Sequence, residues 1–179
     1  MKISIVTAYY NRKNLLYTTL KSIEKSKHKD DVEIIIVDDA SKENERIEDF
    51  KNKFKLSIKI IRIEPSEKTW INPCIPFNIG FKNATGDIVI IQNPECLHMG
   101  DIIDYTLNNM EENTYLNFAC YSIDGELNKR INNLDYSNPS VLVKINLLLN
   151  PMVNRAVTRD GETAWYNHST YRPHMLHFC

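Results

Sequence analysis

The sequence lacks the features of membrane, secreted and nucleic-acid-binding proteins. No run of its 179 residues is long and apolar enough to span a bilayer. Residues 2–7 read as a strand that polar residues follow at once, so the apolar segment of a signal peptide is missing. The formal net charge is -1, whereas nucleic acids and membrane surfaces attract proteins with a basic excess. These absences predict a cytoplasmic protein with no membrane span and no nucleic-acid partner.

Cysteine is scarce, and its spacing is not that of a disulfide scaffold or a typical zinc site. The chain has four cysteines, far apart and without a CxxC pair: Cys74, Cys96, Cys120 and Cys179. Reduced, mostly buried thiols are the expected state. A zinc site built from His174, His177 and Cys179 lacks the usual paired spacing and stands only as a minor alternative.

The periodicity of the sequence indicates alternating strands and helices. Short runs rich in β-branched residues predict strands over residues 3–7, 32–37, 58–63, 88–92 and 116–121. The second and fourth runs are apolar at nearly every position, which favours central strands covered on both faces. Helical spacing occurs between the runs, around residues 15–23, 43–55, 76–84 and 102–110. This order predicts an α/β, Rossmann-like fold with a mainly parallel sheet flanked by helices.

The regular pattern ends after Ser122. We therefore predict a nucleotide-sugar-binding α/β core over residues 1–122 and an irregular extension over residues 123–179 toward an acceptor-binding half. Two alternatives stay open for that half: the sequence is cut short of it, or it lies in a separate chain. Residues 150–172 read as a long irregular segment that carries Trp165.

Polar residues follow the predicted strands where ligands of such sheets bind, beyond the carboxyl ends. Thr7 ends the first strand, Asp38 and Asp39 the second, and Asn93 and Glu95 follow the fourth. A carboxylate in this position can accept hydrogen bonds from a base imide or from ribose hydroxyls. The alternative is that both aspartates only cap the following helix, for which Ser41 is another candidate cap.

Three motifs, in this order and with these gaps, resemble family 2 glycosyltransferases of the GT-A fold. The first is Ile5-Val6-Thr7-Ala8-Tyr9-Tyr10-Asn11-Arg12, and the second is Val37-Asp38-Asp39-Ala40-Ser41. The third joins Asn78-Ile79-Gly80 to Ala84-Thr85-Gly86-Asp87 and the strand after it. The resemblance covers residues 1–110, and a few later histidines are similar to those of galactosyltransferase-like enzymes.

The resemblance implies a transferase that moves a sugar from a nucleotide-diphosphate donor, a UDP-sugar, to a hydroxyl acceptor with inversion. It places Asp39 on the uracil edge and Thr7 and Ala8 against the nucleoside. The full set of implied nucleotide-binding residues is Thr7, Ala8, Tyr9, Arg12, Asp38, Asp39, Asn78 and Asn93. Phe77 stands where family members often have an arginine, so one possible phosphate contact is lost.

A divalent cation, Mn²⁺ or Mg²⁺, is also implied, because family members carry paired aspartates after the fourth strand. Asn93-Pro94-Glu95 stands there in this chain. Glu95 is then the main candidate ligand, with Asn93 and His98 supplementing it. Later candidates for the donor loop or the metal are Trp165, His174 and His177. The alternative is a plain turn with Pro94 at its corner.

The acidic general base that an inverting transferase needs has no candidate in this sequence. Neither the acidic motif nor the glycine-rich segment that precedes it in family members is present. A second hypothesis therefore stands beside the transferase: a nucleotide-sugar-binding module with little or no turnover. The sequence leaves the sugar, the acceptor and the oligomeric state open.

Overall fold

The computed structural model describes residues 1–118, 155–157 and 163–165. Two compact units divide the chain, Met1–Asn108 and Asn109–Cys179. The predicted boundary after residue 122 lies outside the described residues and stays a prediction. Among the described residues, no helix has the length and apolarity needed to cross a membrane.

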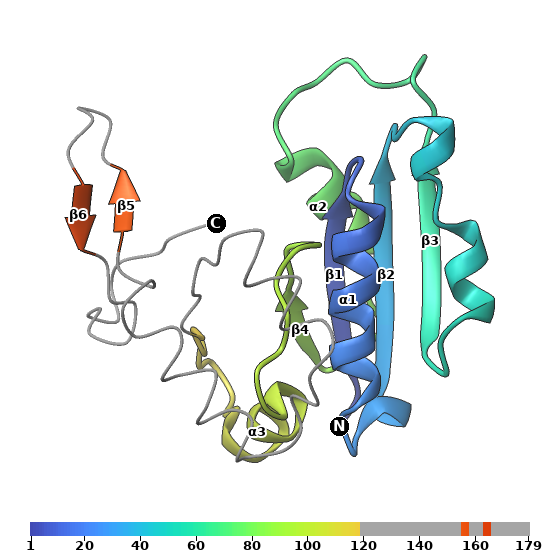
Figure 1. Ribbon diagram of the computed structural model, residues 1–179. Helices are drawn as coiled ribbons and strands as arrows, with labels where there is room; N and C mark the ends of the chain where they lie inside the picture. The colour runs from blue at the N-terminus through green and yellow to red at the C-terminus, as the bar shows by residue number, and fades with distance from the viewer. Residues whose placement is uncertain (119–154, 158–162, 166–179) are drawn as a thin grey trace. The chain divides into compact units, whose positions relative to one another are not determined.

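A four-stranded parallel sheet forms the centre of the first unit (Figure 1). Its strands are β1 (Ile3–Tyr9), β2 (Val32–Asp39), β3 (Ser57–Ile63) and β4 (Ile88–Ile91), in the order β3-β2-β1-β4. All three pairings are parallel. The predicted α/β fold with four parallel strands is therefore confirmed.

Helices cover both faces of the sheet because its strands are apolar on both sides. Helix α1 (Lys13–Glu24) lies in front of β1 and β2 in Figure 1, and α2 (Cys74–Lys82) lies behind them. Helix α1 buries Leu16, Leu20 and Ile23. Under α2, a buried cluster contains Val6, Ile35, Val37 and Ile63. The remaining α-helix of this region is α3 (Ile102–Asn109).

Gly80 lets α2 approach the sheet closely. A Cβ atom at this position would lie 2.3 Å from Val6 Cγ1 and 3.4 Å from Val37 Cγ2. Both valines are fully buried, and β-branched side chains have little rotamer freedom with which to move aside. The glycine therefore fixes the distance between α2, which carries Asn78, and the two central strands.

The segment between β2 and β3 differs from the single helix expected over residues 43–55. It contains two short 3₁₀ helices, η2 (Glu43–Glu45) and η3 (Glu48–Asn52), which are separated by extended backbone at Arg46. The break has a clear cause, because the backbone carbonyl of Glu45 accepts a hydrogen bond from the Tyr9 hydroxyl at 2.6 Å. That carbonyl is consequently used by the end of β1 rather than by a continuing helix. Another 3₁₀ turn, η1 (Lys29–Asp31), precedes β2.

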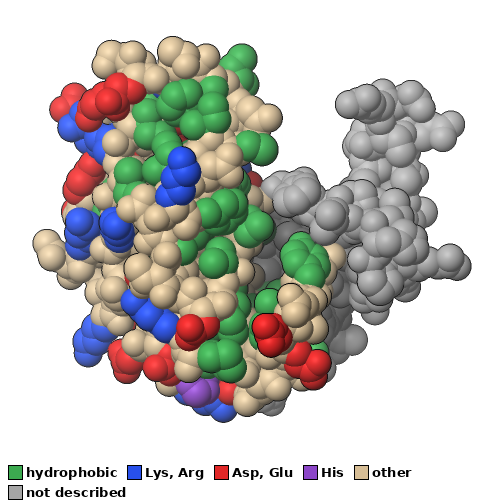
Figure 2. Space-filling view, turned by 180° about the vertical axis from the view of Figure 1, so that it is seen from behind, with side chains coloured by type: hydrophobic (Ala, Val, Ile, Leu, Met, Phe, Trp, Pro, Cys, Tyr) green, Lys and Arg blue, Asp and Glu red, His purple; other side chains and the backbone are tan. Residues whose placement is uncertain are grey.

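Strand β4 pairs with β1 alone among the described residues, so the central position expected for it is not seen there. Its side chains Val89 and Ile91 are 43% and 48% exposed. Figure 2, which is seen from behind Figure 1, shows hydrophobic side chains that gather on the α2 side of the first unit.

The later predicted elements are described only in part. Residues 116–118, the described part of the fifth apolar run, are not in a strand. In the second unit, β5 (Arg155–Val157) and β6 (Thr163–Trp165) form an antiparallel pair, where sequence analysis predicted irregular structure. Residue-by-residue alternation over three positions is too short to be recognised as a strand in a sequence.

Candidate donor-binding site

The turns after β1 and β2 are joined at the carboxyl edge of the sheet. Asn11 and Ala40 both have positive φ angles, 49° and 65°, which turn the chain sharply after each strand. The Asn11 backbone N–H donates to Ser41 Oγ at 3.0 Å, and the Lys42 N–H donates to Asn11 Oδ1 at 2.9 Å. Ser41, a candidate helix cap in the sequence, instead uses its hydroxyl to hold the two turns together.

Asp38 stabilises the turn after β2 from the buried side. Its side chain is fully buried, and Oδ1 accepts the Ser41 backbone N–H at 2.9 Å. Its other oxygen lies 2.9 Å from Nη2 of Arg62, the residue directly opposite it on β3. Arg62 also donates from Nε to Glu48 at 2.7 Å. Burial disfavours the charged guanidinium, but Glu48 and Asp38 outweigh it and raise the pKa of Arg62. The Asp38 carboxylate thus binds Ser41 and Arg62 inside the protein, and its contact with a nucleotide stays a prediction.

Asp39 points to the other face of the sheet and keeps 7% of its surface exposed. Trp70 Nε1 donates to Oδ1 at 3.0 Å, and Lys68 Nζ donates to Oδ2 at 2.8 Å. Both partners come from the segment between β3 and α2. The ammonium of Lys68 also lies 4.4 Å from the ring centroid of Tyr10, a half-exposed residue after β1. Asp39 is therefore held in one orientation by two donors at the edge of the site.

Neither aspartate caps a helix, which had been the alternative interpretation. Helices η2 and η3 after β2 begin without a side-chain hydrogen bond at their first residue. Lys68 is the residue of this cluster that sequence analysis missed, because a lysine in an irregular segment carries no distinguishing pattern. Trp70 also serves packing, since it lies against the buried cluster under α2.

Residues at the end of β1 lie close to this cluster but differ in exposure. Tyr9 is fully buried, and burial raises the pKa of its phenol, whose hydroxyl donates to Glu45. Thr7 is 2% exposed, and its hydroxyl has no hydrogen-bond partner among the described residues. Ala8 is partly exposed and points to the same face as Asp39, because side chains alternate along a strand. Asn78 is exposed on α2.

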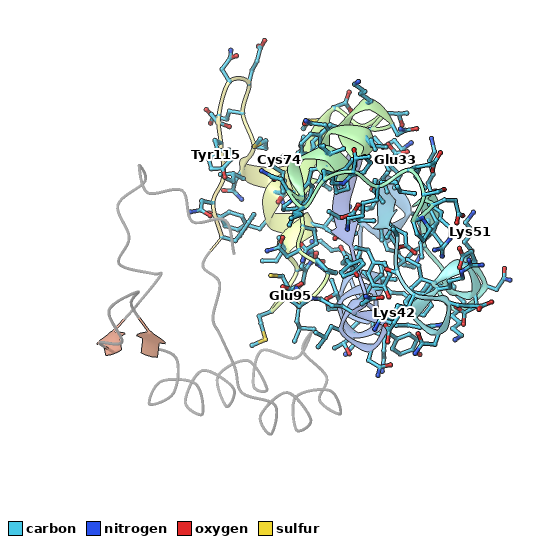
Figure 3. All side chains as sticks on the ribbon, turned by 90° about the horizontal axis from the view of Figure 1, so that it is seen from above. Glu33, Lys42, Lys51, Cys74, Glu95 and Tyr115 are labelled. Atoms are coloured by element: carbon cyan, nitrogen blue, oxygen red, sulfur yellow. The ribbon has the colours of Figure 1, made fainter. Side chains whose placement is uncertain are left out.

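The turn after β4 brings Glu95 to the turn after β1. Glu95 Oε1 forms an ion pair with Arg12 Nη1, and their side chains are 33% and 50% exposed. The backbone of this turn is fixed by the Thr19 hydroxyl, which donates to the Pro94 carbonyl at 2.9 Å. Figure 3 labels Glu95, which lies on the α1 side of the sheet, and Cys74, which lies at α2 on the other side.

His98 does not turn toward Glu95. Its Nε2 lies 2.9 Å from Gln92 Oε1, and its backbone N–H donates to Ser22 Oγ at 3.0 Å. Burial lowers the pKa of the imidazole to about 4, so the ring is neutral at pH 7. In the part of the chain that the structure describes, no three His, Cys, Asp or Glu side chains come together as a metal site. Of the three predicted metal residues, Glu95 and Asn93 share one turn, and His98 is used inside the protein.

The late candidates cannot be placed in this site. Trp165 is the last residue of β6, and it pairs with Arg155, but its side chain is not described. His174 and His177 lie outside the described residues, as does Cys179 of the alternative zinc site.

The chain is similar in sequence to known glycosyltransferases. An N-acetylglucosaminyltransferase of Staphylococcus aureus, the poly(ribitol-phosphate) enzyme TarP, is 26% identical over 127 residues, which are 70% of this chain and 38% of TarP. A glycosyltransferase of Rickettsia conorii is 32% identical over 115 residues, which are 64% of this chain. The chain spans only 18% of the length of that relative. The crystal structure of S. aureus TarS has a TM-score of 0.47 and 27% identity, over 54% of this chain and 17% of TarS.

The strongest comparison covers nearly the whole sequence. The family model of glycosyl transferase family 2 matches residues 4–172, which include the three motifs of the resemblance and the four strands of the sheet apart from Ile3. The chain therefore belongs to glycosyl transferase family 2, a family of enzymes.

Proposed function

We propose that this chain carries the donor-binding part of a glycosyltransferase that moves a sugar from a UDP-sugar to a hydroxyl acceptor with inversion. The observation that carries the proposal is Asp39, a carboxylate held at the carboxyl edge of a family 2 sheet. Uracil presents an imide N–H between two carbonyl oxygens. Each carboxylate oxygen has two acceptor positions, so the bonds from Lys68 and Trp70 leave Asp39 able to accept that N–H. The ammonium of Lys68 has further N–H groups, which could donate to one of the carbonyl oxygens of uracil.

The oxygen atoms of the turn after β4 are suitable ligands for a divalent cation, although only one carboxylate is present. Glu95 and the amide oxygen of Asn93 are the hard oxygen ligands that Mn²⁺ and Mg²⁺ prefer. Bound there, such a cation would neutralise the leaving diphosphate. Arg12 reaches the same turn and is suited to contact the diphosphate directly.

The base-recognition role is tested by UDP binding to Asp39→Asn. This substitution keeps the shape of the side chain and removes its charge, so we expect a loss of about 1–3 kcal/mol in UDP binding, or roughly 5- to 150-fold in Kd. The matched control is Asp87→Asn, which removes one charge where the Asp87 carboxylate binds Lys2 N–H, at the opposite end of β1. Calorimetry on both variants, with circular dichroism to verify the fold, gives the answer. Equal UDP affinity in Asp39→Asn and Asp87→Asn would exclude the uracil contact.

A second function, donor binding with little or no turnover, is favoured by the single carboxylate of Asn93-Pro94-Glu95 and by the lack of a candidate base. Single-turnover transfer distinguishes the two functions. Radiolabelled UDP-sugars are incubated with the 179-residue chain and with a longer protein that contains it, in the presence of hydroxyl acceptors. Labelled glycoside from either protein supports the transferase, whereas bound donor without product from both supports the binding module.

A further inference from the structure

The ion pair between Arg12 and Glu95 joins two side chains that the donor itself would require. Arg12 follows β1 and Glu95 follows β4, so residues 83 positions apart in the sequence meet at the carboxyl edge of the sheet. One would serve the diphosphate and the other a cation. In the structure the two side chains neutralise each other.

We propose that this pair is a counter-ion exchange device that masks Glu95 until a diphosphate arrives. The proposal rests on the donor-binding function given above. Arg12 occupies the carboxylate that would otherwise be open to a cation. An incoming diphosphate draws the guanidinium away and leaves Glu95 open, so that nucleotide and cation enter together. The device also protects the site from binding a cation without its donor.

The exposure of the pair makes such an exchange feasible. The side chains of Arg12 and Glu95 are 50% and 33% exposed, so solvent screens their attraction. The hydrogen bond from Thr19 to Pro94 holds the backbone of the turn after β4 in place. We therefore expect the pair to open by rotation of the two side chains. The diphosphate of a UDP-sugar carries two negative charges, one on each phosphate, and is a stronger partner for a guanidinium than one carboxylate is.

The device has opposite consequences for its two members. Arg12→Gln removes the internal competitor, so Mn²⁺ should bind the nucleotide-free protein about two- to fivefold more tightly, while UDP binds more weakly. Glu95→Gln frees Arg12 and removes a negative charge that faces the diphosphate. UDP should then bind this variant more tightly than the unmodified chain when no Mn²⁺ is present, and Mn²⁺ should no longer improve UDP binding.

The control is Lys13→Gln, which removes the same charge from the adjacent residue. Lys13 pairs with Asp49 at 3.3 Å and not with Glu95. Its loss should leave Mn²⁺ affinity within about a factor of 1.5 of the unmodified chain, because an exposed charge that is not in contact is screened. Electron paramagnetic resonance measures Mn²⁺ binding to the 179-residue chain and its variants, and calorimetry measures UDP binding with and without Mn²⁺.

A rise in Mn²⁺ affinity for Arg12→Gln but not for Lys13→Gln supports the exchange. Equal Mn²⁺ affinity in Arg12→Gln and Lys13→Gln, or no Mn²⁺ binding to any variant, overturns it. If the unmodified chain binds UDP strongly in either of these cases, only the exchange is refuted and the donor-binding function is not. Conversely, a selective rise for Arg12→Gln in a chain that binds no UDP would show that Arg12 covers Glu95, but it would overturn the exchange for a diphosphate together with the binding of UDP.

Discussion

The ion pair of Asp38 and Arg62 is the interaction on which the shape of the donor site should depend most. Asp38 is fully buried, and the Arg62 side chain is 15% exposed. Breaking a buried pair by removing one partner costs about 3–5 kcal/mol, because the other charge stays buried without compensation. Here Arg62 keeps Glu48, and asparagine at position 38 keeps an oxygen for the Ser41 N–H. We therefore expect Asp38→Asn to lower the free energy of unfolding by about 2–3 kcal/mol.

Urea unfolding followed by circular dichroism measures this loss, with Glu48→Gln as the control. Glu48 binds the same guanidinium, but its side chain is 51% exposed, so its substitution should cost under about 1 kcal/mol. Asp38→Ala also removes the acceptor of the Ser41 N–H and should cost about 1 kcal/mol more than Asp38→Asn. A loss for Asp38→Asn no larger than that for Glu48→Gln would refute the reasoning, since it would mean that burial of the pair does not decide its strength.

Two further predictions concern the packing and pH dependence of the same sheet. Gly80→Ala should lower the free energy of unfolding by about 1–3 kcal/mol, because its methyl group would clash with Val6. In a Val6→Ala background the same substitution should cost less, because the clashing methyl group is gone. Strictly additive losses, measured by urea unfolding, would contradict the close approach of α2 to the sheet. Burial alone would raise the pKa of Glu33, but hydrogen bonds from Ser4, Thr85 and Lys2 hold it at about 2, below its usual 4.5. This depressed pKa supplies stability that is complete well above pH 4.5 and is lost as the pH falls toward 2, about 3 kcal/mol in all. Urea unfolding between pH 2 and 6 should therefore show a smaller acid-induced loss for Glu33→Gln than for the unmodified chain, and parallel curves would exclude Glu33 as a cause.

The sequence by itself determined the sheet and the edge at which a ligand would bind. Runs of β-branched residues separated by helical spacing leave few alternatives to parallel strands, because a helix between two neighbouring strands returns the chain so that both run in the same direction. The strands begin at Ile3, Val32, Ser57 and Ile88, close to where the runs do. Since all four strands are parallel, the polar residues after β1, β2 and β4 necessarily share one edge. Motif order then indicated the family.

Only the tertiary structure decided what each polar residue does at that edge. Asp38 and Asp39 are neighbours in the sequence, but alternation along β2 sends one to Arg62 in the interior and the other to Lys68 and Trp70. Ser41 binds Asn11 instead of capping a helix, and His98 binds Gln92 instead of approaching Glu95. Arg12 and Glu95 became partners only when β4 paired with β1. The physical reason is the same in each case: the partner comes from a distant segment, and local sequence carries no record of which segments the packing of the sheet brings together.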